Sequence, residues 1–227
     1  MDLSLQHLWG AMGVPAKLVV IVMTLLLFYS VYIGIERSLL FSKARKQSRA
    51  LAAAIGKPLG EKDVAAALAV ARSDAYKVAY LGAVLTGGLS EFAERMDHHG
   101  VEAVKRAIER TSLQEISSLR KGMNVLATTG STTPFVGLVG TIFGIINAFS
   151  VMSSVGGGDL TAISGGIAEA LVSTAVGITV AIIAIWIYNY FNAVIDEITK
   201  DMSTSSAELI DWCEKEALRR SEGHAAK

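Results

Sequence analysis

The stretch LATTGSTTPFVGLVGTIFGIINAF, residues 126–149, decides the fold of this chain. It lies inside a longer segment, residues 122–158, that has no charged residue. Such a run predicts a helix that crosses a lipid bilayer, because a span needs about 20 predominantly apolar residues. The glycines and threonines indicate more than contact with lipid, since small residues mark the faces where membrane helices pack closely.

Two further spans flank this segment. Residues 18–35 carry no charge, and at 1.5 Å per residue they extend about 27 Å, enough to cross a bilayer. Residues 163–191 are interrupted by one carboxylate, Glu169, and end among Trp186, Tyr188 and Tyr190, where an aromatic belt would lie. With 52% hydrophobic residues and a mean hydropathy of +0.44, the chain is predicted to be an all-α membrane protein with three transmembrane helices.

The basic residues predict the orientation. Of 21 Lys and Arg, 15 lie in residues 36–121, five follow residue 195, and Lys17 alone precedes the first span. Because cytoplasmic loops carry the excess of Lys and Arg, we expect the N-terminus outside and the C-terminus inside. The expected organisation is an outer segment 1–16, spans 17–36, 122–154 and 162–194, an outer loop 155–161, a cytoplasmic helical domain 37–121 and a cytoplasmic helical tail 195–227.

The cytoplasmic parts have helical composition with few interruptions. The expected turn contains Gly56, Pro58 and Gly60, and the expected helical segments are residues 61–72, 73–96 and 101–119, with a break at Gly100. Because nothing between Leu119 and the second span stops a helix, we expect these two to form one helix. The third span is expected to continue as a helix into the cytoplasm, so that the last two spans both extend out of the membrane.

Several other classes of protein are not supported. The chain has 21 Lys and Arg and 21 Asp and Glu, so it has no net positive charge to attract nucleic acid. The lysine motif of Walker nucleotide-binding sites is also absent from the sequence. Cys213 is the only cysteine, so an intrachain disulfide is impossible. Asp97, His98 and His99 could suggest a metal, but a solvated turn is the simpler interpretation. We expect no enzyme activity, metal or cofactor, and we expect the first apolar run to be retained.

Two threonines stand on stripes of small or apolar residues. Around Thr141 the stripe contains Pro134, Gly137, Ile145 and Ala148, and around Thr174 it contains Ala170, Leu171, Gly177, Ile178 and Ala181. One interpretation is tight helix pairing, which Gly140 and Gly144 also favour through their GxxxG spacing. In the other, several copies surround an axis and the stripes form a mostly dry bore with two rings of hydroxyls. Such a bore suits an apolar helix of another protein, whose carboxyl group the hydroxyls can bond.

Glu169 is the one carboxylate within these spans. A charge in the bilayer is costly, so a functional role is the default hypothesis, and a carboxylate at the outer interface is the alternative. Glu169 lies five residues from Thr174, about 140° around a helix, so the two do not share a face. Contact with the bore and contact with a subunit boundary both stay open.

These residues carry a resemblance to the ExbB/TolQ/MotA family of proton-driven motor subunits, in particular its three-span ExbB/TolQ branch. The similar blocks are residues 126–149 and GIAEALVSTAVGITVAI at residues 166–182, followed by Tyr188 and Asn189. Together they cover about a third of the chain, and two long gapped motifs at this separation make the resemblance specific. Thr141 and Thr174 match the threonines of the second and third spans in the family, and Glu169 matches the glutamate of the third.

The resemblance implies a homopentamer in a bacterial inner membrane, with the outer side in the periplasm. Its pore would hold a dimer of an ExbD/TolR-like single-span protein with a transmembrane aspartate. Proton motive force would then drive mechanical work on a periplasmic or outer-membrane load: TonB-dependent transport, a Tol-Pal system or gliding motility, through a TonB/TolA-like or motility-complex protein. Thr141, Thr174 and Glu169 would form the proton pathway.

The sequence departs from the family pattern at two places. Prolines expected before the GIAEAL block and later in the third span are replaced by Gly165 and Ile183, which predicts a straighter third helix. This favours a specialised relative, such as a gliding-motility motor, over a housekeeping member. The rival hypotheses are a passive membrane scaffold whose glycines only pack helices, and an ion channel that needs no partner.

Overall fold

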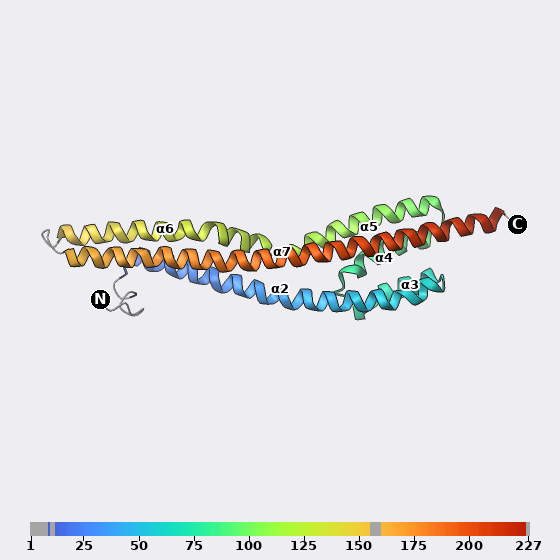
Figure 1. Ribbon diagram of the computed structural model, residues 1–227, viewed down its shortest axis with the longest axis horizontal. Helices are drawn as coiled ribbons and strands as arrows, with labels where there is room; N and C mark the ends of the chain where they lie inside the picture. Colours follow the sequence, from blue (N-terminus) through green and yellow to red (C-terminus); the bar gives the residue numbers. More distant parts are fainter. Residues whose placement is uncertain (1–8, 10–11, 155–159, 226–227) are drawn as a thin grey trace. The chain divides into compact units, whose positions relative to one another are not determined.

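The computed structural model describes residue 9, residues 12–154 and residues 160–225, and every element within them is a helix (Figure 1). The helices are α2 (Val14–Gly60), α3 (Val64–Ala71), the short 3-10 helix η1 (Asp74–Tyr76), α4 (Tyr80–Glu94), α5 (His98–Leu119), α6 (Met123–Ser154) and α7 (Leu160–Ala225). The all-α prediction is confirmed. Most of the expected outer segment 1–16 and outer loop 155–161 lies outside the described residues, and so does the side chain of Glu169.

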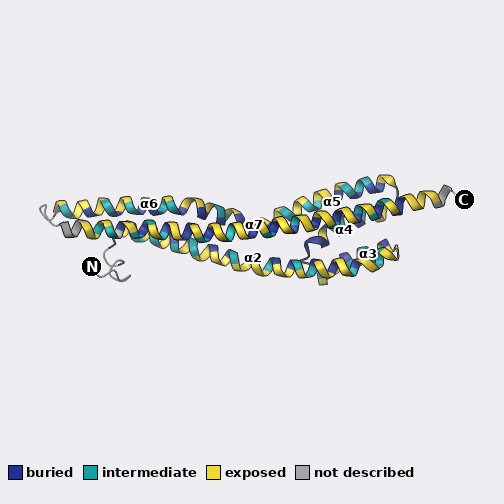
Figure 2. Cartoon of the chain, in the orientation of Figure 1, coloured by how far each residue is buried: buried dark blue, intermediate teal, exposed yellow. Residues whose placement is uncertain are grey.

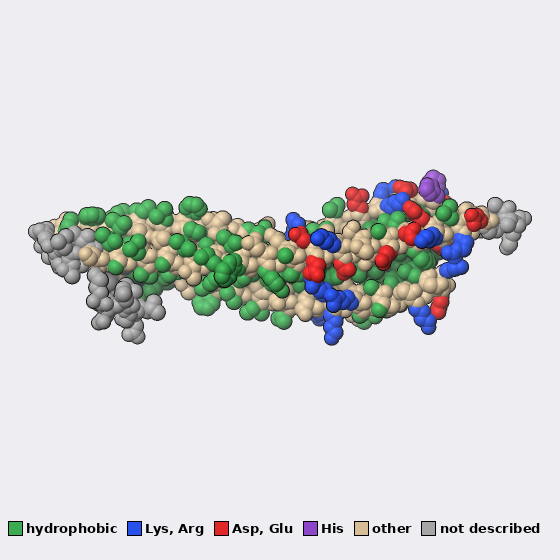
Figure 3. Space-filling view, viewed as in Figure 1, with side chains coloured by type: hydrophobic (Ala, Val, Ile, Leu, Met, Phe, Trp, Pro, Cys, Tyr) green, Lys and Arg blue, Asp and Glu red, His purple; other side chains and the backbone are tan. Residues whose placement is uncertain are grey.

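The chain divides into two compact units. The apolar unit consists of Met1–Ile35 and Gly122–Tyr190, and the charged unit consists of Glu36–Lys121 and Phe191–Lys227. On the face shown in Figure 3, hydrophobic side chains cover the elements of the apolar unit, and Lys, Arg, Asp and Glu gather over those of the charged unit. The helices α2, α6 and α7 are each long and apolar enough to cross a membrane, which confirms the prediction of three such helices.

Large apolar side chains cover the outside of the apolar unit. Phe28 of α2, Phe135 of α6 and Trp186 of α7 are 67%, 69% and 71% exposed, and many leucines, isoleucines and valines of these helices are exposed too. Soluble monomers rarely expose a contiguous apolar surface of this kind. The unit therefore requires lipid, further copies or another apolar partner around it.

Small residues bring α6 and α7 together inside this unit. A Cβ built on Gly144 would lie 2.7 Å from the Cβ of Ala170, and one on Gly166 would lie 2.4 Å from the Cβ of Ala148. A Cβ on Gly177 would lie 2.6 Å from the carbonyl oxygen of Thr133. Real Cβ atoms do not approach so closely, so the separation of the two helices depends on these glycines.

The charged unit has an ordinary hydrophobic core. Its fully buried side chains include Leu51, Phe92 and Met202, and buried positions recur along the helices at intervals of three to four residues (Figure 2). The ring of Phe92 packs edge-on against Trp212 at 5.9 Å between centroids. The indole Nε1–H of Trp212 donates to the carbonyl oxygen of Leu59 over 3.1 Å, which attaches the end of α2 to α7.

The predicted fusion of the helix ending at Leu119 with the second span is wrong. The chain leaves α5 at Leu119 and begins α6 at Met123, and Gly122 between them has φ 85°. Glycine adopts this left-handed backbone without the Cβ penalty of other residues, so Gly122 is the stop signal that the prediction missed. The expected continuation of the third helix is confirmed, because α7 runs unbroken for 66 residues.

Two expected interruptions are displaced along the chain. Gly56, Pro58 and Gly60 all belong to α2, and the turn follows at Lys62, which has φ 61°. Pro58 lies in the last turn of α2 and removes one helical hydrogen bond there, because it has no N–H to donate to the carbonyl four residues earlier. Gly100 does not break a helix; it lies in the first turn of α5, and its N–H donates to the capping carboxylate of Asp97 over 2.8 Å.

We expect Gly122→Ala to destabilise the protein by about 1 kcal/mol, because alanine resists a left-handed backbone. Thermal unfolding of the purified protein in detergent can be followed by labelling of Cys213 with a thiol-reactive dye. This thiol is fully buried, and burial raises its pKa to about 12, so it reacts when the protein unfolds. The control is Gly56→Ala in the exposed part of α2, which should be neutral or stabilising. An unchanged midpoint for Gly122→Ala would contradict the role of this residue.

A second prediction concerns the contact between α6 and α7. Gly144→Ala should force the helices apart at Ala170 and cost about 1–3 kcal/mol, the usual range for overpacking. The matched control is Gly165→Ala, since a Cβ on Gly165 meets nothing within 4 Å. The same labelling assay compares the two variants. Equal stability of both would show that the helices can separate freely at this crossing.

Candidate functional site

The structure brings together the two threonines that the sequence singles out. Thr141 of α6 and Thr174 of α7 are 33 residues apart, and their hydroxyls are hydrogen-bonded to each other. The Oγ1 of Thr141 also contacts the carbonyl oxygens of Ala170 and Gly137, at 3.1 Å and 3.3 Å. The Oγ1 of Thr174 lies 3.4 Å from the carbonyl oxygen of Gly137. We call these two residues the threonine pair.

The threonine pair depends on the small residues beside it. Gly137, Gly140, Gly144 and Ala148 of α6 and Ala170, Gly177 and Ala181 of α7 are all buried. Two of them are especially close, since a Cβ built on Gly137 would lie 3.3 Å from the Cα of Gly177. This approach of the backbones lets a hydroxyl on one helix reach a carbonyl oxygen on the other, as the contact of Thr141 with Ala170 shows.

The hydroxyls can bond a carboxyl group in either protonation state. Each has one proton to donate and two lone pairs to accept. Their two protons are shared among both hydroxyl oxygens and the carbonyl oxygens of Gly137 and Ala170. Lone pairs are therefore left over for an incoming O–H. Rotation of one hydroxyl releases a donor for a carboxylate.

The contacts of α2 lie to one side of the threonine pair. A Cβ built on Gly140 of α6 would lie 3.0 Å from Val19 of α2, and one built on Gly177 of α7 would lie 3.2 Å from the sulfur of Met23 of α2. Gly140 precedes Thr141 by one residue, about 100° around the helix, and Gly177 follows Thr174 by three residues, about 60° around the helix. The pair is half-buried, and its neighbours one turn away include Leu138, Leu171 and Ile178, which are 52%, 59% and 46% exposed. The open side of the pair is therefore apolar.

A third hydroxyl lies in the interior beside the pair. Ser173 is fully buried, and its Oγ makes no hydrogen bond. A Cβ built on Gly140 would lie 2.8 Å from the Cβ of Ser173 and 3.0 Å from Val19 of α2, so this serine is enclosed by three helices. Ser173 cannot be identified from the sequence, because a serine beside a threonine gives no signal of which of the two is buried.

The other predicted site residues contribute less to this geometry. Pro134 lies within α6, half-buried, seven residues before Thr141. Glu169 belongs to α7, but its side chain lies outside the described residues, so its position relative to the threonine pair stays a prediction. In sequence, Lys17 and Glu169 are the only Lys, Arg, Asp or Glu within residues 12–35, 122–158 and 160–190.

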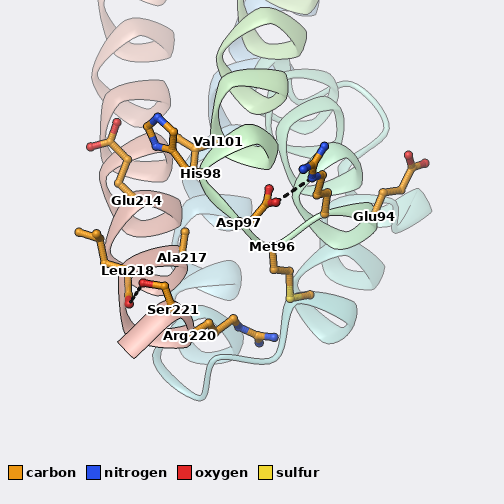
Figure 4. A pocket seen from close by; sticks show the side chains of 11 residues that line it. Glu94, Met96, Asp97, His98, Val101, Glu214, Ala217, Leu218, Arg220 and Ser221 are labelled. Atoms are coloured by element: carbon orange, nitrogen blue, oxygen red, sulfur yellow. Dashed lines mark hydrogen bonds and ion pairs between the residues drawn. The ribbon is translucent and has the colours of Figure 1, made fainter. Parts of the chain in front are cut away.

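The Asp97-His98-His99 sequence has a structural explanation. Asp97 caps α5, and the Gly100 N–H that it accepts holds the pKa of its carboxyl below the usual value. The second oxygen of Asp97 accepts a hydrogen bond from the Nε of Arg95 over 2.8 Å. Asp97 and His98 border a cavity of about 760 Å³ that Glu214 and Leu218 of α7 also line (Figure 4). Within the described residues, no three His, Cys, Asp or Glu are grouped as a metal would require.

Known proteins resemble about half of the chain. Biopolymer transport protein ExbB of Xanthomonas campestris pv. campestris (strain B100) is 37% identical over 127 residues, 56% of this chain and 48% of that protein. Tol-Pal system protein TolQ of Pseudomonas aeruginosa is 39% identical over 116 residues, 48% of this chain and 50% of that protein. ExbB of Pseudomonas putida is 40% identical over 109 residues, 48% of this chain and 33% of that protein.

This chain spans about half the length of the first two of these relatives and a third of the last. The family described as the MotA/TolQ/ExbB proton channel family matches residues 78–204, which is more than half of the chain and includes α4, α5, α6 and most of α7. The threonine pair and its glycines lie within the matched residues. The chain belongs to the MotA/TolQ/ExbB proton channel family.

Proposed function

We propose that this protein is the proton-channel subunit of an inner-membrane motor, in which proton motive force drives mechanical work through a single-span ExbD/TolR-like partner. The observation that carries the proposal is the hydroxyl pair of Thr141 and Thr174, shared between two helices and open on a side lined by apolar residues. A partner helix with one carboxyl group fits this side. The family membership and the relatives named ExbB and TolQ support the same role.

The mechanism follows from the hydrogen-bonding capacity of the pair. A charged carboxylate on the partner accepts from a threonine hydroxyl, which holds the partner helix in place. Protonation removes the charge and weakens this bond, because hydrogen bonds to charged groups are about twice as strong as neutral ones. The partner helix is then free to move to the next copy, where it releases its proton.

The magnitudes are compatible with this mechanism. One proton crossing 100 mV releases about 2.3 kcal/mol. A hydrogen bond between membrane helices contributes about 0.6–2 kcal/mol. A few proton transfers therefore supply enough free energy to break and remake the bonds at the threonine pair during each step.

The assembly in this proposal is a homopentamer with the N-terminus in the periplasm and the C-terminus in the cytoplasm. The exposed apolar side chains of α6 and α7 support it, because lipid, neighbouring copies and the partner must cover them together. The basic residues of Glu36–Lys121 support the orientation. The load is an envelope process of the kind for which the ExbB and TolQ relatives are named.

A passive scaffold is the second candidate function. The close glycine contacts between α6 and α7 favour it, since packing alone would require them. A scaffold does not require that two hydroxyls meet on the accessible side of these helices. The two functions therefore differ in what the threonine hydroxyls contribute.

We expect Thr141→Val and Thr174→Val each to lower proton flux by about 10- to 100-fold, because each removes a hydrogen bond to a charged group worth about 1.5–3 kcal/mol. Valine keeps the branched shape, so assembly should persist. The measurement is proton uptake by proteoliposomes that contain the complex with its partner, under an imposed potential, read with a pH-sensitive dye.

The matched control is Thr179→Val. Thr179 is exposed on the same helix as Thr174, and its hydroxyl donates only to the carbonyl oxygen of Ala175. This variant should conduct normally, and Thr141→Ser should retain most of the flux. Full flux in both valine variants of the threonine pair, with normal assembly, would reject the proton-transfer role and favour the scaffold.

A further inference from the structure

The charged unit contains a second cavity, of about 640 Å³, that the proposed function does not use. Its walls come from α2, η1, α4 and α5 and from the segment between α3 and α4. Four charged residues line it, and none of them is in an ion pair: Arg72, Asp74, Lys77 and Glu115. Acidic and basic side chains that line one cavity without pairing with each other are available to bind a ligand that carries a positive and a negative charge.

Glu115 provides the acidic wall. It lies on α5, half-buried, and burial alone raises the pKa of its carboxyl. Within the described part of the chain, Glu115 is in no ion pair. Thr111 and Ser118, four residues before and three after, line the same cavity and offer hydroxyl oxygens on the same helix face. One carboxylate with neighbouring hydroxyls suits an ammonium group with its three donors, whereas a divalent metal needs more oxygen ligands.

Arg72 and Lys77 provide the basic wall. Arg72 caps the end of α3 and donates to the Oγ of Ser90 over 3.0 Å, and Lys77 caps the end of η1. Both side chains are exposed. Their guanidinium and ammonium groups, five residues apart in the sequence, suit a phosphate group, because a phosphate accepts hydrogen bonds from several donors at once.

Two apolar residues that line the cavity are close in sequence to the predicted membrane-spanning segments. Leu40 follows Ile35, the end of the first uncharged run, by five residues of the continuous helix α2, a rise of about 7.5 Å. Leu119 ends α5 four residues before the start of α6. In the sequence, both lining residues are therefore within five residues of an uncharged run, residues 18–35 for Leu40 and residues 122–158 for Leu119.

We propose that this cavity binds the headgroup of a zwitterionic aminophospholipid, phosphatidylethanolamine, with its ammonium at Glu115 and its phosphate at Arg72 and Lys77. The inference requires that the chain spans a membrane, and it is independent of proton transfer at the threonine pair.

The test uses the full chain, stripped of lipid in a non-ionic detergent, and native mass spectrometry of the lipids that rebind. The probes are phosphatidylethanolamine, its N-monomethyl and N-dimethyl forms and phosphatidylcholine, all with the same acyl chains. Each methyl group removes one ammonium donor. Retention should therefore fall along the series, by about tenfold in total, as expected for the loss of a hydrogen bond to a charged group.

The variants assign the two ends of the headgroup. In Glu115→Gln the four lipids should be retained equally, because the neutral amide no longer prefers an ammonium group with more donors. Lys77→Gln should weaken all four lipids alike. The matched control is Glu109→Gln, an exposed glutamate of the same helix that does not line the cavity, and it should behave like the wild type.

Glycerophosphoethanolamine, added as a soluble competitor, distinguishes the source of the headgroup. If it is without effect at millimolar concentration, the ligand is the intact lipid; if it displaces the lipid, the site also accepts free headgroups from water. Equal retention of all four lipids by the wild type, or a normal series in Glu115→Gln, would overturn the proposal. So would a change of oligomeric state in Glu115→Gln without a change in lipid retention, which would assign the cavity to a basic side chain of a second copy.

Discussion

The close approach of α6 and α7 is the constraint on which the site depends. Glycines and alanines at intervals of three to four residues face one another, and several have no room for another carbon atom. In a bilayer this approach cannot be driven by burying apolar surface, because lipid is equally apolar. Van der Waals contact and hydrogen bonds between the helices must stabilise it instead. The threonine pair supplies such a bond and is itself possible only because the backbones are so close.

Sequence reasoning recovers the elements that depend on composition and period. Three uncharged runs are enough to predict three membrane helices, and the spacing of small residues is enough to place Thr141 and Thr174 on stripes. The stripes do not predict that the two hydroxyls meet within one chain. A ring of hydroxyls around a pore and a hydrogen-bonded pair between two helices give the same periodicity in the sequence. The distinction requires the relative depth and rotation of α6 and α7, which only the structure provides.

The displaced helix boundaries have a common physical origin. Gly56 and Gly60 were expected to lie in a turn, yet α2 continues through both of them. Its end is held against the core, because Leu51 is fully buried and the carbonyl oxygen of Leu59 accepts a hydrogen bond from Trp212. Gly122, which carried no expectation, adopts the left-handed conformation that ends a helix. A glycine permits a break without requiring one, so its effect depends on tertiary packing. The Asp97 cap similarly makes Gly100 part of a helix rather than its end.

The buried hydroxyl of Ser173 has a consequence for how firmly the two helices hold each other. An unsatisfied polar group in an interior typically costs about 1–3 kcal/mol. Ser173 places that cost next to the threonine pair, in a contact that is otherwise close-packed. Any slight parting of the crossing that admits a water or an alternative acceptor to Ser173 would recover part of this energy. The unsatisfied hydroxyl therefore offsets part of the packing energy that holds α6 and α7 together beside the threonines.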